Sequence, residues 1–226
     1  HEIITPKSVE NALRVLLAIS GSTNAVVHLA AIAGRRGIDL PLENINRISD
    51  ETPVLVNLKP TGEHYMQDLF AAGGLTAVLH ELKHQLHLDC LTVTGETLGQ
   101  WLSETPKWVD RNVIRAFDDP YQKEGGLIAL FGTLAPTGAI LKRAAADSNL
   151  FERTGRAVVF DSLEDLSKRI DSEDLDVSED DFLVLKNAGP KSESCMPEAG
   201  YLPIPKKLAV RGVKDMVRIS DARMSG

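Results

Sequence analysis

Three histidines and a glutamate in one short segment form the pattern with the most explicit chemistry. His80, Glu81 and His84 satisfy the H-E-x-x-H spacing, in which two histidines one helical turn apart hold zinc and the glutamate acts as a base. His87 adds a third imidazole on the same face of an ideal helix. Leucines and valines occupy nearly the opposite face, which makes the histidines the polar side of an amphipathic helix. The favoured interpretation is a stripe of histidines that faces solvent or an interface. A zinc-dependent hydrolase that uses His80, Glu81 and His84 is the alternative.

Two loops near the end of the chain carry polar groups that packing does not explain. Glu198 lies in a Pro/Gly-rich segment after a predicted strand, and a carboxylate in such a loop is suited to bind a hard cation. On the residues alone, an exposed surface glutamate is the simpler interpretation. Residues 220–226 follow another predicted strand and hold two serines, an aspartate and an arginine beside a glycine. If the two strands are parallel neighbours, both loops leave the sheet at the same carboxyl edge.

The two cysteines have unrelated surroundings. Cys90 lies in an apolar context, where an unpaired cysteine usually behaves as a small core residue. Cys195 lies in a loop of Gly, Pro and Ser with no histidine nearby in sequence to activate it, so a residue without chemistry is favoured. Two cysteines are too few for a disulfide framework or a four-thiolate metal site.

Apolar periodicity predicts a helix-rich first part that would position the histidines. A first helix starts at Thr5-Pro6, an N-cap followed by proline at the first helical position. A second helix covers about 22–37, and residues 63–85 are helical with a break at Gly73-Gly74. The short β-branched run 53–57 predicts a strand.

The second part of the chain is predicted to hold most of the β structure and to position the two polar loops. A domain boundary is placed between residues 122 and 123, where the helical periodicity has faded. Ser162-x-x-Asp165 is an imperfect capping box, with Asp in place of Glu or Gln, that opens a helix ending near Ile170. This helix would connect two strands of a strand, helix, strand unit. The predicted strands are 127–132, 137–142, 157–160, 182–186 and 216–219.

Composition excludes several classes of function. The 226 residues are 43% hydrophobic and 25% charged, with a net charge of −7, which is typical of a globular chain with one or two domains. An acidic chain without a basic run argues against nucleic acid and against an anionic membrane surface as partners. The longest apolar stretch, 25–33, is much shorter than the ~20 residues of a spanning helix. The first residues show no signal peptide. We therefore expect a cytoplasmic or organelle-matrix protein.

A series of short motifs resembles the dihydroxy-acid/6-phosphogluconate dehydratase family. The motifs follow one another in the order in which the family has them and cover nearly the whole chain, which makes the resemblance specific. They are GSTNAVVHL at 21–29, KPTG at 59–62, MQDL at 66–69, AGGL at 72–75, LTVTG at 91–95, KNAGP at 186–190, MPE at 196–198 and SDARMSG at 220–226.

The resemblance implies an α/β fold class and a division of the chain. The family has an N-terminal α/β domain that carries an iron–sulfur cluster and Mg²⁺, and a β-rich, barrel-like C-terminal domain that closes over it. Residues 1–122 would be the helix-rich, C-terminal part of the first domain. Residues 123–226 would be the first part of the closing domain.

The resemblance also implies a reaction. Family members are hydro-lyases that remove the C2 proton and the C3 hydroxide from a 2,3-dihydroxy carboxylic acid, and the resulting enol becomes a 2-keto acid. Glu198 corresponds to the family's Mg²⁺ ligand and Ser225 to its base. A serine hydroxyl is a poor base at neutral pH, so it could act only as an alkoxide stabilised by metal charge. The partners implied are a small hydroxy-acid substrate and further copies of the chain in a homo-oligomer.

Two departures from the family qualify this expectation. Family members are more than twice as long, and their three cluster cysteines lie in segments that precede everything present here, so neither Cys90 nor Cys195 replaces them. The chain is therefore expected to be an internal fragment without dehydratase activity of its own. Residues 191–195 also replace a Gly-rich run, which affects the direction in which Glu198 points. A non-catalytic interaction fragment stays open as a further alternative.

The amino-acid sequence of residues 221–225 indicates a substrate class. It is more similar to the sugar-acid members, such as arabinonate or xylonate dehydratases, than to the branched-chain biosynthetic members. A sugar acid is therefore favoured over a branched-chain dihydroxy acid.

Overall fold

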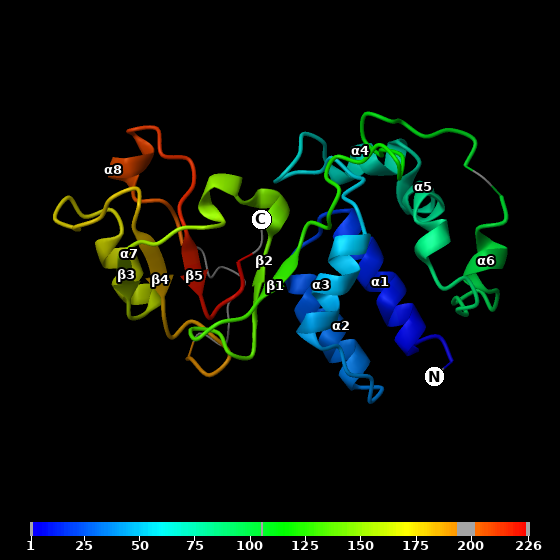
Figure 1. The fold of residues 1–226 in the computed structure, drawn as a ribbon, viewed down its shortest axis with the longest axis horizontal. Helices are drawn as coiled ribbons and strands as arrows, with labels where there is room; N and C mark the ends of the chain where they lie inside the picture. Colours follow the sequence, from blue (N-terminus) through cyan, green and yellow to red (C-terminus); the bar gives the residue numbers. More distant parts are fainter. Residues whose placement is uncertain (1, 105, 194–201, 225–226) are drawn as a thin grey trace. The chain divides into compact units, whose positions relative to one another are not determined.

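The computed structural model describes residues 2–104, 106–193 and 202–224 (Figure 1). Contacts between residues divide the chain into two compact units, unit 1 within residues 1–145 and unit 2 within residues 146–225. The predicted boundary between residues 122 and 123 concerns the domains of the resembled family and stays a prediction.

Unit 1 is built mainly from helices. Helix α1 (Pro6–Ala18) begins where the sequence predicts, because the Thr5 and Ser8 side chains each bond the backbone N–H of the other. Helix α3 was not predicted, although Ile45 and Ile48 are spaced for one buried face. The remaining helices of unit 1 are α2 (Asn24–Gly34), α3 (Leu42–Glu51), α4 (Met66–Ala71), α5 (Gly74–Glu81), α6 (Leu98–Trp101) and the short 3₁₀ helices η1 (Lys83–Gln85) and η2 (Arg143–Ala145).

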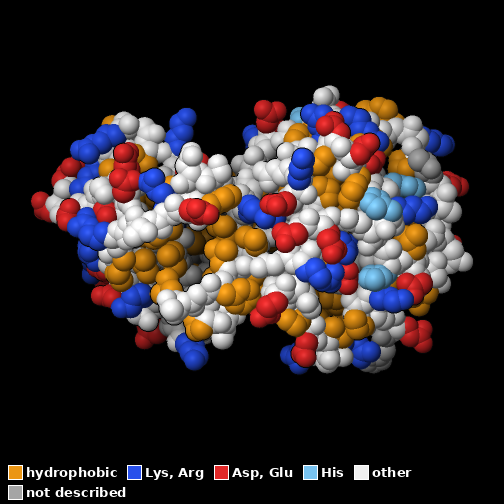
Figure 2. Space-filling view, in the orientation of Figure 1, with side chains coloured by type: hydrophobic (Ala, Val, Ile, Leu, Met, Phe, Trp, Pro, Cys, Tyr) orange, Lys and Arg blue, Asp and Glu red, His pale blue; other side chains and the backbone are white. Residues whose placement is uncertain are grey.

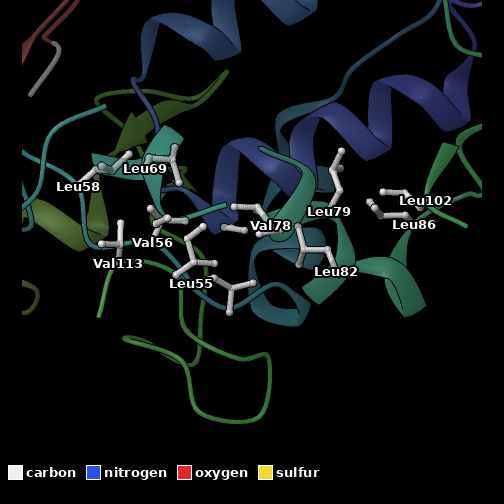
Figure 3. Close-up of a cluster of buried hydrophobic side chains, with 14 of the residues drawn as sticks. Leu55, Val56, Leu58, Leu69, Val78, Leu79, Leu82, Leu86, Leu102 and Val113 are labelled. Carbon is white, nitrogen blue, oxygen red and sulfur yellow. The ribbon is translucent and has the colours of Figure 1, made fainter. Parts of the chain in front are cut away.

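Helix α1 contributes to both buried clusters of unit 1. Its Leu13 and Leu17 are fully buried in a cluster with Ile45 of α3 and Leu127. Its last residue, Ala18, joins the second cluster, which combines segment 55–58 and helices α4 and α5 with residues between 82 and 114 and is drawn in Figure 3. Each fully buried leucine contributes about 2 kcal/mol, so burial in these two clusters stabilises unit 1 strongly.

The predicted strand at 53–57 is wrong, although its central residues are buried as expected. Val54 and Val56 form only isolated bridges, to Gln122 and Ile114. The N–H of Leu55 between them donates instead to the carbonyl of Ala18, at the end of α1. The backbone of this segment thus bonds to four separate parts of the chain, so no continuous ladder forms.

An antiparallel hairpin completes unit 1. It consists of β1 (Ile128–Leu130) and β2 (Ala139–Leu141), as the sequence predicts. The Asn46 side chain of α3 bonds both the N–H and the carbonyl of Ala129, at 2.7 and 2.8 Å. This pair of hydrogen bonds attaches the hairpin to the helical core.

Unit 2 contains a parallel sheet with strand order β3 (Ala157–Phe160), β4 (Phe182–Leu185) and β5 (Arg218–Ser220). One face of the sheet carries the side chains of Val158, Phe160, Leu183 and Leu185, which are buried in one cluster with Leu208 and the apolar side of α7. The Ser162 hydroxyl accepts from the N–H of Asp165 and starts α7 as predicted. The elements of unit 2 are η3 (Ser148–Leu150), β3 (Ala157–Phe160), α7 (Leu163–Arg169), β4 (Phe182–Leu185), α8 (Lys206–Ala209) and β5 (Arg218–Ser220).

The mixed α/β fold class is confirmed, with helices dominating the first part and every named strand of the described residues lying after residue 127. The described strands form a two-stranded and a three-stranded sheet. Within the described ranges, no helix is long and apolar enough to cross a membrane. On the visible face, Lys and Arg side chains are interspersed with Asp and Glu (Figure 2).

Candidate functional site

The candidate site is the carboxyl edge of the parallel sheet in unit 2. Strands β3, β4 and β5 run in the same direction, with Phe160 paired to Leu185 and Leu185 paired to Ser220. The residues that follow these strands therefore leave the sheet at one edge, where open parallel sheets usually bind ligands. They are Asp161 after β3, residues 186–190 after β4 (the β4 loop) and residues 221–224 after β5 (the β5 loop).

The β4 loop is attached to the end of β3 by two polar contacts. The Lys186 ammonium lies 2.8 Å from the Asp161 carboxylate, and this hydrogen bond raises the pKa of Lys186. The Asn187 side chain donates to the carbonyl of Asp161 at 2.9 Å. Asn187 has φ 56°, a left-handed conformation that asparagine tolerates better than most residues. The chain thus turns sharply directly after β4.

The same loop is attached to the β5 loop by Asp221. The buried N–H of Ala188 donates to the Asp221 carboxylate at 3.0 Å. Gly189 also lies against Asp221, because a Cβ on this glycine would be 2.8 Å from both the backbone oxygen and a carboxylate oxygen of Asp221. Any side chain at position 189 would therefore separate the two loops.

Hydrogen bonds between residues two or three positions apart in sequence shape the chain at each loop. The Ser192 hydroxyl donates to the carbonyl of Gly189 at 2.7 Å. The N–H of Ala222 donates to the Ser220 hydroxyl at 2.9 Å. Ala222 and Met224 pack against the buried cluster of unit 2. The candidate site is therefore supported directly by the hydrophobic core.

The predicted metal ligand Glu198, the predicted base Ser225 and Cys195 lie outside the described residues. The condition on which their predicted proximity depends is confirmed, since β4 and β5 are parallel neighbours. The proximity of Glu198 and Ser225 itself stays a prediction. Sequence reasoning did not identify the Asp161 and Asp221 contacts, which join residues far apart in the chain.

Comparison with known families shows which family the chain belongs to. A model described as dihydroxy-acid/6-phosphogluconate dehydratase N-terminal matches residues 1–101, and the corresponding C-terminal model matches residues 112–226. The chain belongs to the dihydroxy-acid/6-phosphogluconate dehydratase family. The C-terminal dehydratase model covers the whole of unit 2, including both the β4 and the β5 loop.

Individual relatives in this dehydratase family act on two types of acid, according to their names. The chain is 46% identical to an L-arabinonate dehydratase of Rhizobium leguminosarum bv. trifolii and 48% identical to an L-arabonate dehydratase of Azospirillum brasilense. It is 42% identical to a dihydroxy-acid dehydratase of Caldanaerobacter subterraneus. All three matches cover 100% of this chain but only 39%, 39% and 40% of the respective relatives. The chain thus spans about two fifths of the length of these dehydratases.

The predicted histidine stripe does not lie on one continuous helix. Helix α5 ends at Glu81, His84 lies in the 3₁₀ helix η1, and His87 follows η1. The His84 ring packs edge-on against Phe117, with ring centroids 4.2 Å apart. The Nε2 of His87 lies 3.5 Å from a carboxylate oxygen of Glu10. The prediction that one helical face presents all three imidazoles is therefore wrong.

The glutamate of the H-E-x-x-H segment is engaged in structural contacts. The Glu81 carboxylate accepts from a guanidinium N–H of Arg111 at 2.8 Å and from the backbone N–H of Phe117 at 3.1 Å. Among the described residues, which include this whole segment, no three His, Cys, Asp or Glu side chains are grouped to hold a metal ion. The geometry gives the zinc-hydrolase alternative no support.

The described residues do not fit an iron–sulfur cluster either. Cys90 is the one cysteine within the described ranges, and it is partly exposed rather than part of the core, contrary to the prediction. Burial and then the Asp89 charge raise the pKa of the Cys90 thiol. A raised pKa disfavours the thiolate that a cluster requires. The Mg²⁺ ligand that the family resemblance implies, Glu198, stays a prediction.

Proposed function

We propose that the whole protein is a hydro-lyase that converts a 2,3-dihydroxy carboxylic acid into a 2-keto acid. The observation that carries the proposal is the match to both the N-terminal and the C-terminal dehydratase models. The contact between the β4 and β5 loops supports it, because each loop begins a segment that resembles the family's reactive motifs.

The reaction needs a base at C2 and assistance for the departing hydroxide at C3. Proton loss and hydroxide loss give an enol, which tautomerises to the 2-keto acid. We assign the C2 proton to Ser225 and cation binding to Glu198, both on the motif resemblance. Mg²⁺ and an iron–sulfur cluster are proposed as cofactors of the whole enzyme, where they would supply Lewis-acid chemistry.

We propose a sugar acid as the substrate class. Two relatives named for arabinonate are 46% and 48% identical to this chain, compared with 42% for the dihydroxy-acid dehydratase. The amino-acid sequence of residues 221–225 also favours the sugar-acid dehydratases. Assembly of the whole enzyme as a homo-oligomer is part of the proposal, and light scattering tests it.

The test uses the full-length protein, purified without oxygen. L-arabinonate, D-xylonate and a branched-chain 2,3-dihydroxy acid are supplied in parallel, and the 2-keto acid is trapped with semicarbazide. We expect turnover of a sugar acid. Absence of a 2-keto acid from all three substrates would refute the proposal, and exclusive use of the branched-chain acid would refute the substrate class.

Two variants test the assigned residues. Ser225→Ala is expected to abolish turnover without changing Mg²⁺ and iron content, because a base can be removed without removing a ligand. Glu198→Gln is expected to weaken Mg²⁺ binding. Ser167→Ala, at an exposed serine of α7, is the matched control and should retain wild-type turnover. Wild-type turnover by Ser225→Ala would rule out the assigned base.

The isolated 226-residue chain is proposed to lack dehydratase activity, in line with the non-catalytic alternative for this part. The same trapping assay applied to the isolated chain tests this. Formation of a 2-keto acid by the isolated chain would contradict it.

A further inference from the structure

One carboxylate connects the two loops of the candidate site. Asp221 accepts from the N–H of Ala188 at 3.0 Å, and its backbone and side chain lie against Gly189. Ala188 is fully buried, so its N–H has no access to water that could replace this bond. The contact joins residues 33 positions apart in the sequence.

We infer that Asp221 is a positioning residue, which fixes the β4 loop against the β5 loop. For its catalytic consequence this inference rests on the proposed dehydratase function. In sequence, the β4 loop leads towards Glu198 and the β5 loop leads towards Ser225. A bond that fixes the position at which both segments start would constrain how the proposed base and the proposed cation ligand approach one substrate. Misplacement by about 1 Å is sufficient to lower turnover by about 100-fold.

The inferred role needs a hydrogen-bond acceptor but not a negative charge. Asparagine keeps an oxygen at the position that accepts from Ala188, whereas alanine removes it. A carboxylate that bound a metal ion or moved a proton would lose its role in both variants. Comparing Asp221→Asn with Asp221→Ala therefore separates positioning from direct chemistry.

The experiment measures structure and catalysis separately in the full-length protein. Amide hydrogen exchange at Ala188 reports the bond directly, and kcat and KM for the sugar acid report its consequence. We expect Asp221→Ala to accelerate exchange at Ala188 by about 10- to 100-fold, since a buried donor loses its partner. We expect kcat to fall by a similar factor, KM to change little, and Asp221→Asn to restore most of both.

Asp180→Asn is the matched control for the loss of a carboxylate. Asp180 lies just before β4, at the opposite end of the strand, and pairs with Arg153 on the exposed surface. This variant should leave exchange at Ala188 and kcat unchanged.

Each remaining outcome decides the inference. An unchanged exchange rate at Ala188 in Asp221→Ala overturns it, and so does an Asp221→Asn variant as inactive as Asp221→Ala. If Asp221→Ala does not fold, Gly189→Ala replaces it, because the added Cβ pushes Asp221 away while keeping every polar group. If the wild-type protein shows no turnover, the proposed function fails, and exchange at Ala188 still decides whether Asp221 joins the loops.

Discussion

The ion pair between Arg156 and Asp181 is expected to stabilise unit 2 in a pH-dependent way. Arg156 precedes β3 and Asp181 precedes β4, and two guanidinium nitrogens lie 2.8 and 3.2 Å from the two carboxylate oxygens. The N–H of Ser178 adds a third bond to this carboxylate at 2.7 Å. The Asp181 side chain is only 6% exposed. Asp181→Asn removes the charge but keeps the size of the side chain.

The magnitude follows from the pKa of Asp181, which the Arg156 hydrogen bond lowers from 3.8 to about 2. A shift of this size corresponds to at most about 2.5 kcal/mol at 1.36 kcal/mol for each pH unit. Because Arg156 is half-exposed, solvent screening reduces the expected contribution to about 1–2 kcal/mol.

The direction of the pH dependence follows from the sign of the shift. The folded state holds the proton of Asp181 more weakly than the unfolded state, so the stabilisation is complete above the unfolded pKa of 3.8. It decreases as the pH falls towards the folded pKa of about 2. About half of it should be lost by pH 3.

Hydrogen exchange measured by mass spectrometry reports the stability of unit 2 separately from that of unit 1 in the 226-residue chain. At pH 7, Asp181→Asn should accelerate the slowest amides of β3 and β4 by about 5- to 30-fold, which corresponds to 1–2 kcal/mol. Asp180→Asn is the matched control, since Asp180 is 70% exposed and should contribute little. Urea unfolding followed by far-UV circular dichroism at pH 7 and pH 3 measures the pH dependence. Unchanged exchange in β3 and β4, or an equal destabilisation at both pH values, would refute the reasoning.

Three further predictions concern other parts of the chain. Ser162→Ala removes the cap that accepts from Asp165 and should lower the unfolding free energy of unit 2 by about 1 kcal/mol, measured by the same exchange experiment; no change would contradict it. Arg14→Met removes a buried guanidinium that bonds the partly exposed carboxylates of Glu10 and Glu51, and it should lower the unfolding free energy of unit 1 by about 2 kcal/mol. Urea unfolding followed by the fluorescence of the two tryptophans, both in unit 1, tests it, and a loss under 1 kcal/mol would count against it. Anaerobic reconstitution of the 226-residue chain should give no stoichiometric iron and sulfide, because two cysteines of unrelated context do not make a cluster site; visible charge-transfer bands would show the opposite.

Local signals predicted the starts of α1 and α7 correctly. The caps at Thr5 and Ser162 act within three residues of the helix that they open, so the sequence contains the whole interaction. The end of α5 was less predictable. Apolar periodicity continues past Glu81, but the helix stops there, and Glu81 is bonded to Arg111 and to the backbone of Phe117. Both partners lie far along the chain, and no local pattern contains them.

Segment 53–57 shows the same limit for strands. Its β-branched residues indicate burial correctly, since Val54, Leu55 and Val56 are all buried. A strand also needs one partner in continuous register, and the backbone bonds of this segment go instead to residues 18, 64, 113–115 and 121–122. Propensity and hydrophobicity indicate that a residue favours a buried, extended conformation. A hydrogen-bonded ladder also depends on which other segment the fold places next to it.

The same reasoning explains how the core of unit 2 determines the geometry of the candidate site. Met216 is buried, and two residues later Arg218 pairs with Leu183 of β4. Met216 lies two residues before β5, so a slip of the chain by one residue, about 3.3 Å, would displace this side chain from the buried cluster of unit 2. Its burial therefore favours the observed register of β5 against β4. The same slip would move Asp221 away from the N–H of Ala188, which only the observed register places within hydrogen-bonding distance. Sequence could predict that the two loops share an edge, but which carboxylate holds which backbone group depends on a register set by packing.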